Sequence, residues 1–180
     1  GVNHVGHHAL ARLLLPALRA GAPSRVVCLS SLGHLRADTA FVDHPRLETE
    51  PYDPWVAYGN AKFANVLFAR EFHARHADGG RGVSAFSVHP GGIFTGLQDD
   101  VHATTMFKWL VVAPFFFKSI QQGCATTLYC ALEPGIEGDG GEYFDNMAVG
   151  TRKKKSGLDK AGALWEATEA LIDAVSKKTK

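Results

Sequence analysis

The sequence predicts an α/β fold in which helices cover both faces of a parallel sheet. Helical patterns and short apolar runs alternate along the chain in the order helix–strand–helix–strand–helix–strand–helix. The apolar runs are continuous, which is typical of strands buried on both faces. Because crossovers between parallel strands are right-handed, the connecting helices are expected on both sides of the sheet.

Length and composition indicate one domain, residues 1–180, with a sizeable core. Hydrophobic residues make up 46% and charged residues 21%, which is ordinary for a globular protein. The net charge of +1 gives no indication of a nucleic acid partner. The three cysteines show no metal-binding spacing, which favours a reducing compartment, and we expect a cytoplasmic location. The chain opens at Gly1 without a Met and enters a helical pattern at once, so we expect a piece of a longer protein.

The first half of the chain contains two helices and one strand. Leucines at helical spacing predict a helix over residues 3–20, which ends at Gly21-Ala22-Pro23. Arg25–Ser30 is a short apolar run and reads as a buried strand. Residues 32–54 are rich in Gly, Asp and Pro and predict a long loop, and a second helix is expected from about 55 to 77.

The second half contains two strands and two helices. A strand is predicted at Gly82–Val88 and is stopped by His89-Pro90-Gly91-Gly92. The remaining predicted elements are a helix over 119–132, a strand at Gly141–Phe144 and a helix over 158–176. The apolar stretch Met106–Phe117 is interrupted by Pro114, so it is too short to span a membrane. It is interpreted as core, as a lid over an apolar substrate or as a surface that touches a membrane.

The strand ends indicate where a ligand binds. Ser30-Ser31 and His89-Pro90-Gly91 each follow a predicted strand, and ligands of such sheets bind at the carboxyl ends of the strands. Tyr58 and Lys62 are four residues apart and share one helix face. An ammonium held against a phenol favours the phenolate, so such a pair can act as a general acid or base near pH 7. A serine hydroxyl at the strand end is suited to hold the reacting oxygen.

These residues resemble the catalytic motif of short-chain dehydrogenases/reductases. Ser31, Tyr58 and Lys62 match the Ser…Tyr-x-x-x-Lys triad, and Asn3 resembles the helix asparagine that completes the tetrad. Residues 90–95 match the segment Pro-Gly-x-Ile/Val-x-Thr, which holds the nicotinamide in that family. Four blocks are typical of the retinol dehydrogenase and WW-domain-oxidoreductase branch: residues 3–7, 25–31, 87–91 and 121–127. The long insertion between Ser31 and Tyr58 is also typical of it.

The resemblance implies a Rossmann-like, doubly wound parallel sheet, truncated to its second half, with about three strands. The Gly-rich loop T-G-x-x-x-G-x-G, which holds the cofactor phosphates at a helix N-terminus, does not occur in the sequence. The dinucleotide-binding half that carries it is therefore expected to be missing. The resemblance favours NADP slightly over NAD, although the residues that decide between them belong to that half.

The resemblance also implies a role for each site residue. Tyr58 would transfer the proton, and Lys62 would assist it and bind the nicotinamide ribose. Ser31 would polarise the substrate oxygen, with Ser30 as the competing candidate. Asn3 would hold a water next to Lys62, or it merely caps the first helix. Pro90, Gly91, Ile93 and Thr95 would bind the cofactor, with the backbone of Ile93 and the hydroxyl of Thr95 on the carboxamide.

The resemblance implies hydride transfer between a nicotinamide and an apolar alcohol or carbonyl, such as a retinoid, a steroid or a lipid aldehyde. A homodimer is compatible with it, because the helices at Asn3 and Tyr58 commonly form the dimer face of the family. Peripheral membrane contact is a further expectation. The alternative is a non-catalytic module that binds a partner or dimerises. A serine hydrolase is disfavoured because the sequence has no G-x-S-x-G elbow.

Two polar clusters suggest sites that we do not favour. His4, His7 and His8 have the spacing of metal ligands on a helix, but no carboxylate or thiolate is near them in the sequence, so no metal is expected. The basic run Arg152–Lys155 is interpreted as a solvated loop, with contact to anionic lipid or a cofactor phosphate as the alternative.

Overall fold

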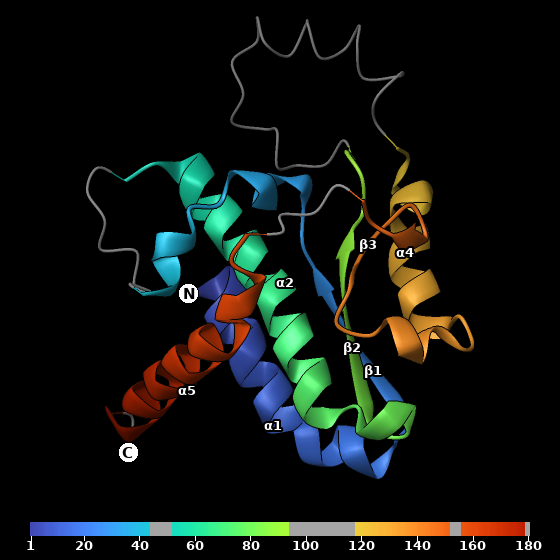
Figure 1. Cartoon of the computed structure of the whole chain (residues 1–180), viewed down its shortest axis with the longest axis horizontal. Coiled ribbons are helices and arrows are strands. Elements are labelled where there is room, and N and C mark those ends of the chain that lie inside the picture. Colours follow the sequence, from blue (N-terminus) through green and yellow to red (C-terminus); the bar gives the residue numbers. More distant parts are fainter. Residues whose placement is uncertain (44–51, 94–117, 152–155, 179–180) are drawn as a thin grey trace, which may run out of the picture.

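A four-stranded sheet forms the centre of the computed structural model, which describes residues 1–43, 52–93, 118–151 and 156–178 (Figure 1). The strands lie in the order β1-β2-β3-β4. The first three are parallel, and β4 runs antiparallel to β3. Their bounds are Ser24–Leu29 for β1, Val83–His89 for β2, Tyr143–Asp145 for β3 and Ala148–Val149 for β4. The predicted α/β class and parallel sheet are confirmed.

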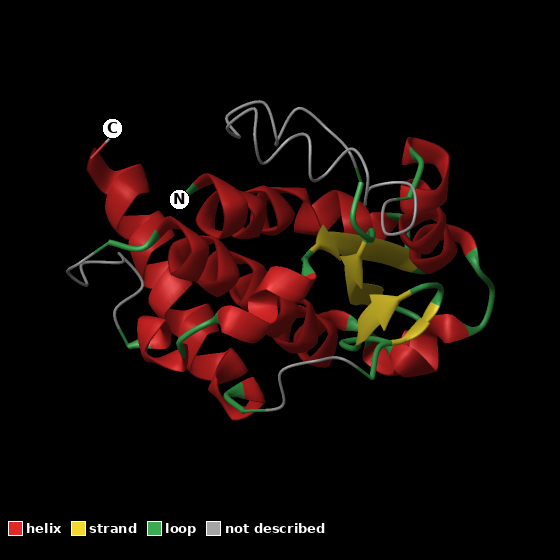
Figure 2. Cartoon of the chain, turned by 90° about the horizontal axis from the view of Figure 1, so that it is seen from above, coloured by secondary structure: helices red, strands yellow, loops and turns green. Residues whose placement is uncertain are grey.

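Helices cover both faces of this sheet (Figures 1 and 2). Their bounds are His7–Ala20 for α1, Pro54–His76 for α2, Ile120–Leu132 for α4 and Ala161–Lys178 for α5. Helix α2 packs against β1 and β2 and is itself covered by α5, whereas α4 lies on the opposite face. Each range agrees with its predicted helix to within a few residues.

Local sequence signals explain where the two central helices begin. The Asp53 side chain accepts hydrogen bonds from the N–H groups of Trp55 and Val56, and Pro54 occupies the first turn of α2. Helix α4 begins with a capping box in which Ser119 and Gln122 bond each other's backbone. Both caps satisfy N–H groups that have no partner within the helix.

The core lies on the two faces of β2, whose seven residues are all buried. Val83 and Ala85 face α1 and α2 and pack with Phe68 and Phe72. Phe86 and Val88 face α4 and pack with residues of α4, β3 and the turn before β3, namely Cys130, Phe144 and Ile136. A third cluster joins α2 to α5 and to the short helix at Thr39–Val42. Burial on both faces explains why the apolar residues of this strand occupy both its odd and its even positions.

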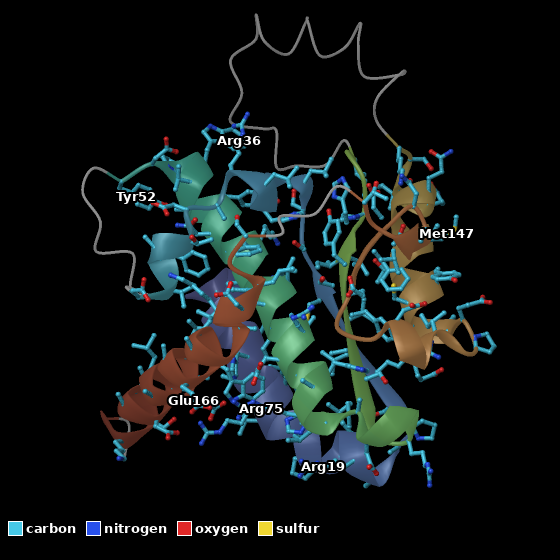
Figure 3. The ribbon with its side chains drawn as sticks, viewed as in Figure 1. Arg19, Arg36, Tyr52, Arg75, Met147 and Glu166 are labelled. Atoms are coloured by element: carbon cyan, nitrogen blue, oxygen red, sulfur yellow. The ribbon has the colours of Figure 1, made fainter. Side chains whose placement is uncertain are left out.

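Polar contacts fasten α5 to the helices beneath it. Arg75 of α2 lies over the Trp165 ring, 4.9 Å from its centroid, and bonds Glu166 at 2.8 Å (Figure 3). From α1, His8 bonds Glu169 at 2.7 Å, and Arg12 bonds Asp173 at the same distance.

Within the described ranges, no helix has the length and apolar character needed to cross a lipid bilayer.

The apolar stripe of α1 is largely exposed, contrary to what its helical spacing suggests. Leu10, Leu13 and Leu14 are 55%, 78% and 46% exposed, while His8 and Ala11 form the buried face. Leu10 and Leu14 instead line a cavity of about 370 Å³ between α1 and β1. In the described part of the chain, β1 pairs with β2 alone, so this apolar face lies along an open sheet edge.

Three local features differ from the prediction. The predicted loop over 32–54 contains 3-10 helices at Leu32–Arg36 and Thr39–Val42, and its residues 44–51 lie outside the described residues. A π-helix, Val2–Gly6, precedes α1. Strand β4 was not predicted, because it has two residues and its hairpin turns at Asn146 and Met147, which adopt positive φ without a Gly to mark the turn.

Candidate active site

The carboxyl ends of β1 and β2 lie side by side, as the sequence predicts. Leu29 pairs with Val88, and the Ser30 N–H donates to the Val88 carbonyl at 2.8 Å. The segments that follow the two strands, at Ser31 and at Pro90, therefore begin at the same edge of the sheet. In parallel sheets this edge is where ligands bind.

The two serines after β1 have different surroundings. Ser30 is buried, and its hydroxyl donates to the Lys62 carbonyl in α2 at 2.8 Å. Ser31 is half-buried, and its Oγ accepts the Gly33 N–H at 3.1 Å, which caps the 3-10 helix at Leu32–Arg36. The hydroxyl of Ser30 therefore fastens β1 to α2, while that of Ser31 keeps a hydrogen to donate to another group.

Tyr58 and Ser31 approach each other at Gly33. A Cβ atom on Gly33 would lie 2.9 Å from Tyr58 Cε1 and 3.5 Å from Ser31 Oγ. One residue further along α2, a Cβ atom on Gly59 would lie 2.8 Å from the Gly33 carbonyl oxygen. Sequence reasoning missed both glycines, although Gly59 directly follows Tyr58 and Gly33 lies two residues after Ser31. Their lack of a side chain lets the loop after β1 pack against the helix that carries the tyrosine.

Lys62 lies one helical turn beyond Tyr58 and on the same side of α2. Its Nζ is 5.6 Å from the centroid of the Tyr58 ring and donates to the Leu29 carbonyl at 3.3 Å. Burial lowers the pKa of Lys62, because the protein around it replaces part of the water that stabilises an ammonium. The structure thus brings Ser31, Tyr58 and Lys62 together at the carboxyl edge.

Asn3 is less closely connected to this group. It lies in the π-helix before α1, and its side chain is exposed and forms no hydrogen bond with any described residue. Another asparagine, Asn65, is closer to Lys62. Its side chain donates at 3.0 Å to the Leu29 carbonyl, which also accepts from Lys62. A role for Asn3 in the tetrad stays a prediction.

The loop after β2 holds the remaining predicted cofactor contacts. Gly91 has φ of +92°, a conformation that favours glycine, and its Cα faces the Lys118 side chain. The Lys118 N–H donates to the Gly92 carbonyl at 2.7 Å, and Ile93 pairs with Lys118 in an isolated bridge. The close approach of Ile93 to Gly123 fixes this loop against α4. Thr95 lies outside the described residues, as do Met106–Phe117 and Arg152–Lys155.

Two of the three histidines near the start of the chain, His4 and His8, are buried packing residues, whereas His7 is exposed. His4 bonds Asn65 and Thr168, each at 3.3 Å, and His8 bonds Glu169. The rings of His8 and Trp165 are 4.3 Å apart. The part of the chain that the structure describes contains no group of three potential metal ligands.

Comparison with known proteins identifies relatives of the whole chain. Mouse retinol dehydrogenase 12 is 38% identical over 175 residues, which are 96% of this chain and 53% of the relative. Human WW domain-containing oxidoreductase is 37% identical over 180 residues, or 95% of this chain and 42% of the relative. Bovine dehydrogenase/reductase SDR family member 13 is 38% identical over 178 residues, or 94% of this chain and 45% of the relative. The chain thus spans about half the length of the curated relatives it matches.

The fold is also found in a solved structure. A crystal structure of an uncharacterized protein from Mycobacterium paratuberculosis aligns with a TM-score of 0.64 and 28% sequence identity, covering 95% of this chain and 57% of the other. No protein-family model matches the sequence. The similarity to the curated relatives extends over nearly the whole chain. The chain therefore belongs to the short-chain dehydrogenase/reductase family, on the branch of the retinol dehydrogenases and WW domain-containing oxidoreductases.

Proposed function

We propose that this protein is an NAD(P)-dependent oxidoreductase that interconverts an alcohol and a carbonyl group on an apolar substrate. The observation that carries the proposal is the placement of the Ser31 hydroxyl and the Tyr58 ring at Gly33, with the Lys62 ammonium 5.6 Å from the centroid of that ring. The retinol dehydrogenase names of two relatives favour a retinoid-like substrate.

The described residues fit the nicotinamide end of such a cofactor. The ammonium of Lys62 lies beside Tyr58, and Pro90, Gly91 and Ile93 directly follow β2 at the same edge of the sheet. The residues that hold the phosphates in the family have no counterpart in this sequence. A bound nicotinamide would supply hydride to the carbonyl carbon or accept it from the alcohol carbon.

Each protein side chain then has one task in the reaction. During reduction the Tyr58 hydroxyl donates its proton to the substrate oxygen, and during oxidation the phenolate takes that proton back. The Lys62 ammonium stabilises the phenolate electrostatically. The Ser31 hydroxyl donates a hydrogen bond to the same oxygen, which polarises the carbonyl group. Asn3 would connect Lys62 to solvent through a water molecule, and Thr95 would bind the carboxamide.

Replacement of Tyr58 by Phe tests the proposal. In a full-length protein that also carries the phosphate-binding half, we expect turnover of retinal with NADPH or NADH, followed through the reduced cofactor's absorbance, to fall by about 10²-fold or more, because phenylalanine has no transferable proton. Tyr52→Phe is the matched control, since Tyr52 is 63% exposed and lies before α2 (Figure 3). Unchanged turnover in Tyr58→Phe would refute the catalytic assignment.

A second candidate function is a binding or dimerising module without catalysis. The open edge of β1 and the exposed leucines of α1 favour it, because unpaired strand edges and apolar patches recruit partners. Titration of this chain with NADPH and NADH, followed by cofactor fluorescence, separates the two functions. Cofactor binding supports the enzyme. A lack of binding together with dimers in analytical ultracentrifugation supports the module.

A further inference from the structure

We propose that Asn65 is a positioning residue for Lys62 and that it acts through the carbonyl oxygen of Leu29. The inference rests on the proposed function, because it concerns how the ammonium is kept beside Tyr58. Asn65 is 1% exposed and lies on α2, three residues after Lys62, so the two side chains leave neighbouring positions of the same helix face.

The Leu29 carbonyl is the point at which the two side chains meet. It accepts from Lys62 Nζ at 3.3 Å and from Asn65 Nδ2 at 3.0 Å. The N–H on the other side of this peptide, that of Ser30, donates to β2. Because the C=O and N–H of a trans peptide point in opposite directions, the Leu29 carbonyl points away from β2. Side chains of α2 can therefore reach it without competing with the sheet.

The orientation of the Asn65 amide is fixed by a chain of buried hydrogen bonds. Its Nδ2 must face the Leu29 carbonyl, so its Oδ1 faces His4 Nδ1 at 3.3 Å, and this nitrogen must carry the proton. His4 Nε2 is then the acceptor, 3.3 Å from the hydroxyl of the fully buried Thr168 on α5. Burial lowers the pKa of His4 to about 4, which keeps the ring in the neutral form that this pattern requires.

One set of hydrogen positions thus satisfies every group from α5 to Lys62. Thr168 donates to His4, His4 donates to Asn65, and Asn65 donates to the Leu29 carbonyl. A long lysine side chain loses considerable freedom when it is held in one position. A carbonyl that is itself held at a fixed place gives the ammonium a defined site next to the phenol, which is what proton transfer requires.

The test compares two buried asparagines of α2. In Asn65→Leu the amide is replaced by an apolar side chain of similar size. Asn60→Leu is the matched control, because Asn60 is 6% exposed and its Oδ1 accepts the Asp38 N–H at 2.9 Å, away from Leu29. The readout is the titration of Lys62, observed by NMR after reductive methylation of the lysines with ¹³C-formaldehyde. The Lys62 signal is identified by its loss in Lys62→Arg.

We expect the pKa of Lys62 to move up toward that of the exposed lysines in Asn65→Leu, because the released ammonium reaches water. In Asn60→Leu it should stay as in the unmodified sequence. If Asn65→Leu does not fold, Asn65→Ala serves as the second variant, since it adds no charge and has no donor for Leu29. It should raise the Lys62 pKa as well.

A folded Asn65→Leu or Asn65→Ala protein whose Lys62 titrates as in the unmodified chain would overturn the proposal. An equal change in Asn60→Leu would overturn it too, because the effect would then be a general loosening of α2. The measurement needs no turnover. If Tyr58→Phe keeps its activity while the Lys62 signal responds to Asn65, the proposed function fails and the positioning role stands.

Discussion

Burial of His4 makes the stability of this protein sensitive to mild acid. His4 is 8% exposed and lies between Asn65 on α2 and Thr168 on α5. Burial is the main cause that lowers its pKa, and the neighbouring His8 lowers it further. The perturbation that tests this is His4→Gln, which removes the titratable ring and retains an amide donor for Asn65.

The size of the effect follows from the two pKa values. Above pH 6.5 the ring is neutral in both the folded and the unfolded chain, and no stability is lost. As the pH falls, the unfolded chain takes up a proton near 6.5, whereas the folded chain does so near 4. At about 1.4 kcal/mol for each pH unit of difference, His4 removes about 3 kcal/mol of stability by pH 4. Most domains have only about 5–15 kcal/mol in total.

Urea unfolding at pH 7, 6, 5 and 4 measures this loss as a change in the free energy of unfolding. We expect the decline between pH 7 and 4 to be about 3 kcal/mol smaller in His4→Gln than in the unmodified protein. His7→Gln is the control, because His7 belongs to the same helical turn and its side chain is exposed. Parallel declines in all three proteins would refute the reasoning. The remaining acid sensitivity should come from other buried groups, such as His8, whose pKa is also lowered by burial.

Two further predictions follow from packing. Gly59→Ala should lower the free energy of unfolding, measured in urea, by about 1–3 kcal/mol, because the new methyl group would lie 2.8 Å from the Gly33 carbonyl oxygen. Gly138→Ala is the control and should change this free energy much less, because the space around Gly138 is open. In the folded protein, a thiol reagent should modify Cys124 alone, because Cys28 and Cys130 are buried and their pKa values are raised to about 12 by burial; mass spectrometry that finds rapid modification of either buried cysteine would contradict this.

The sequence was sufficient for the order of the elements and for part of the site. Alternation of helical and apolar segments depends on local periodicity, so it predicted β1, β2 and all four long helices to within a few residues. The spacing of Tyr58 and Lys62 guaranteed a shared helix face. Because parallel neighbouring strands end at one edge, Ser31 was expected near them, and the contacts at Gly33 agree with that expectation.

The sequence could not assign roles to residues of the same type that lie close together in the chain. Ser30 and Ser31 have the same side chain and are neighbours in the sequence. They differ because the Ser30 hydroxyl donates to the Lys62 carbonyl, 32 residues away. The histidines near the start of the chain resembled possible metal ligands, but His4 and His8 pack against α2 and α5. The function of a polar side chain in the core depends on its partner, which local sequence does not specify.

The fold class and the shared helix face of Tyr58 and Lys62 could be inferred from the sequence alone. Both depend on helical and strand periodicity, which is a property of short stretches of sequence. Three features required the folded structure: the buried face of α1, the serine whose hydroxyl can still donate to a ligand, and the Asn65 hydrogen bond to the Leu29 carbonyl beside Lys62. The physical reason is that burial and hydrogen-bond partners are properties of distant segments brought together. Asn65 acquires its place from a strand 36 residues away and, through His4, from Thr168 at the other end of the chain.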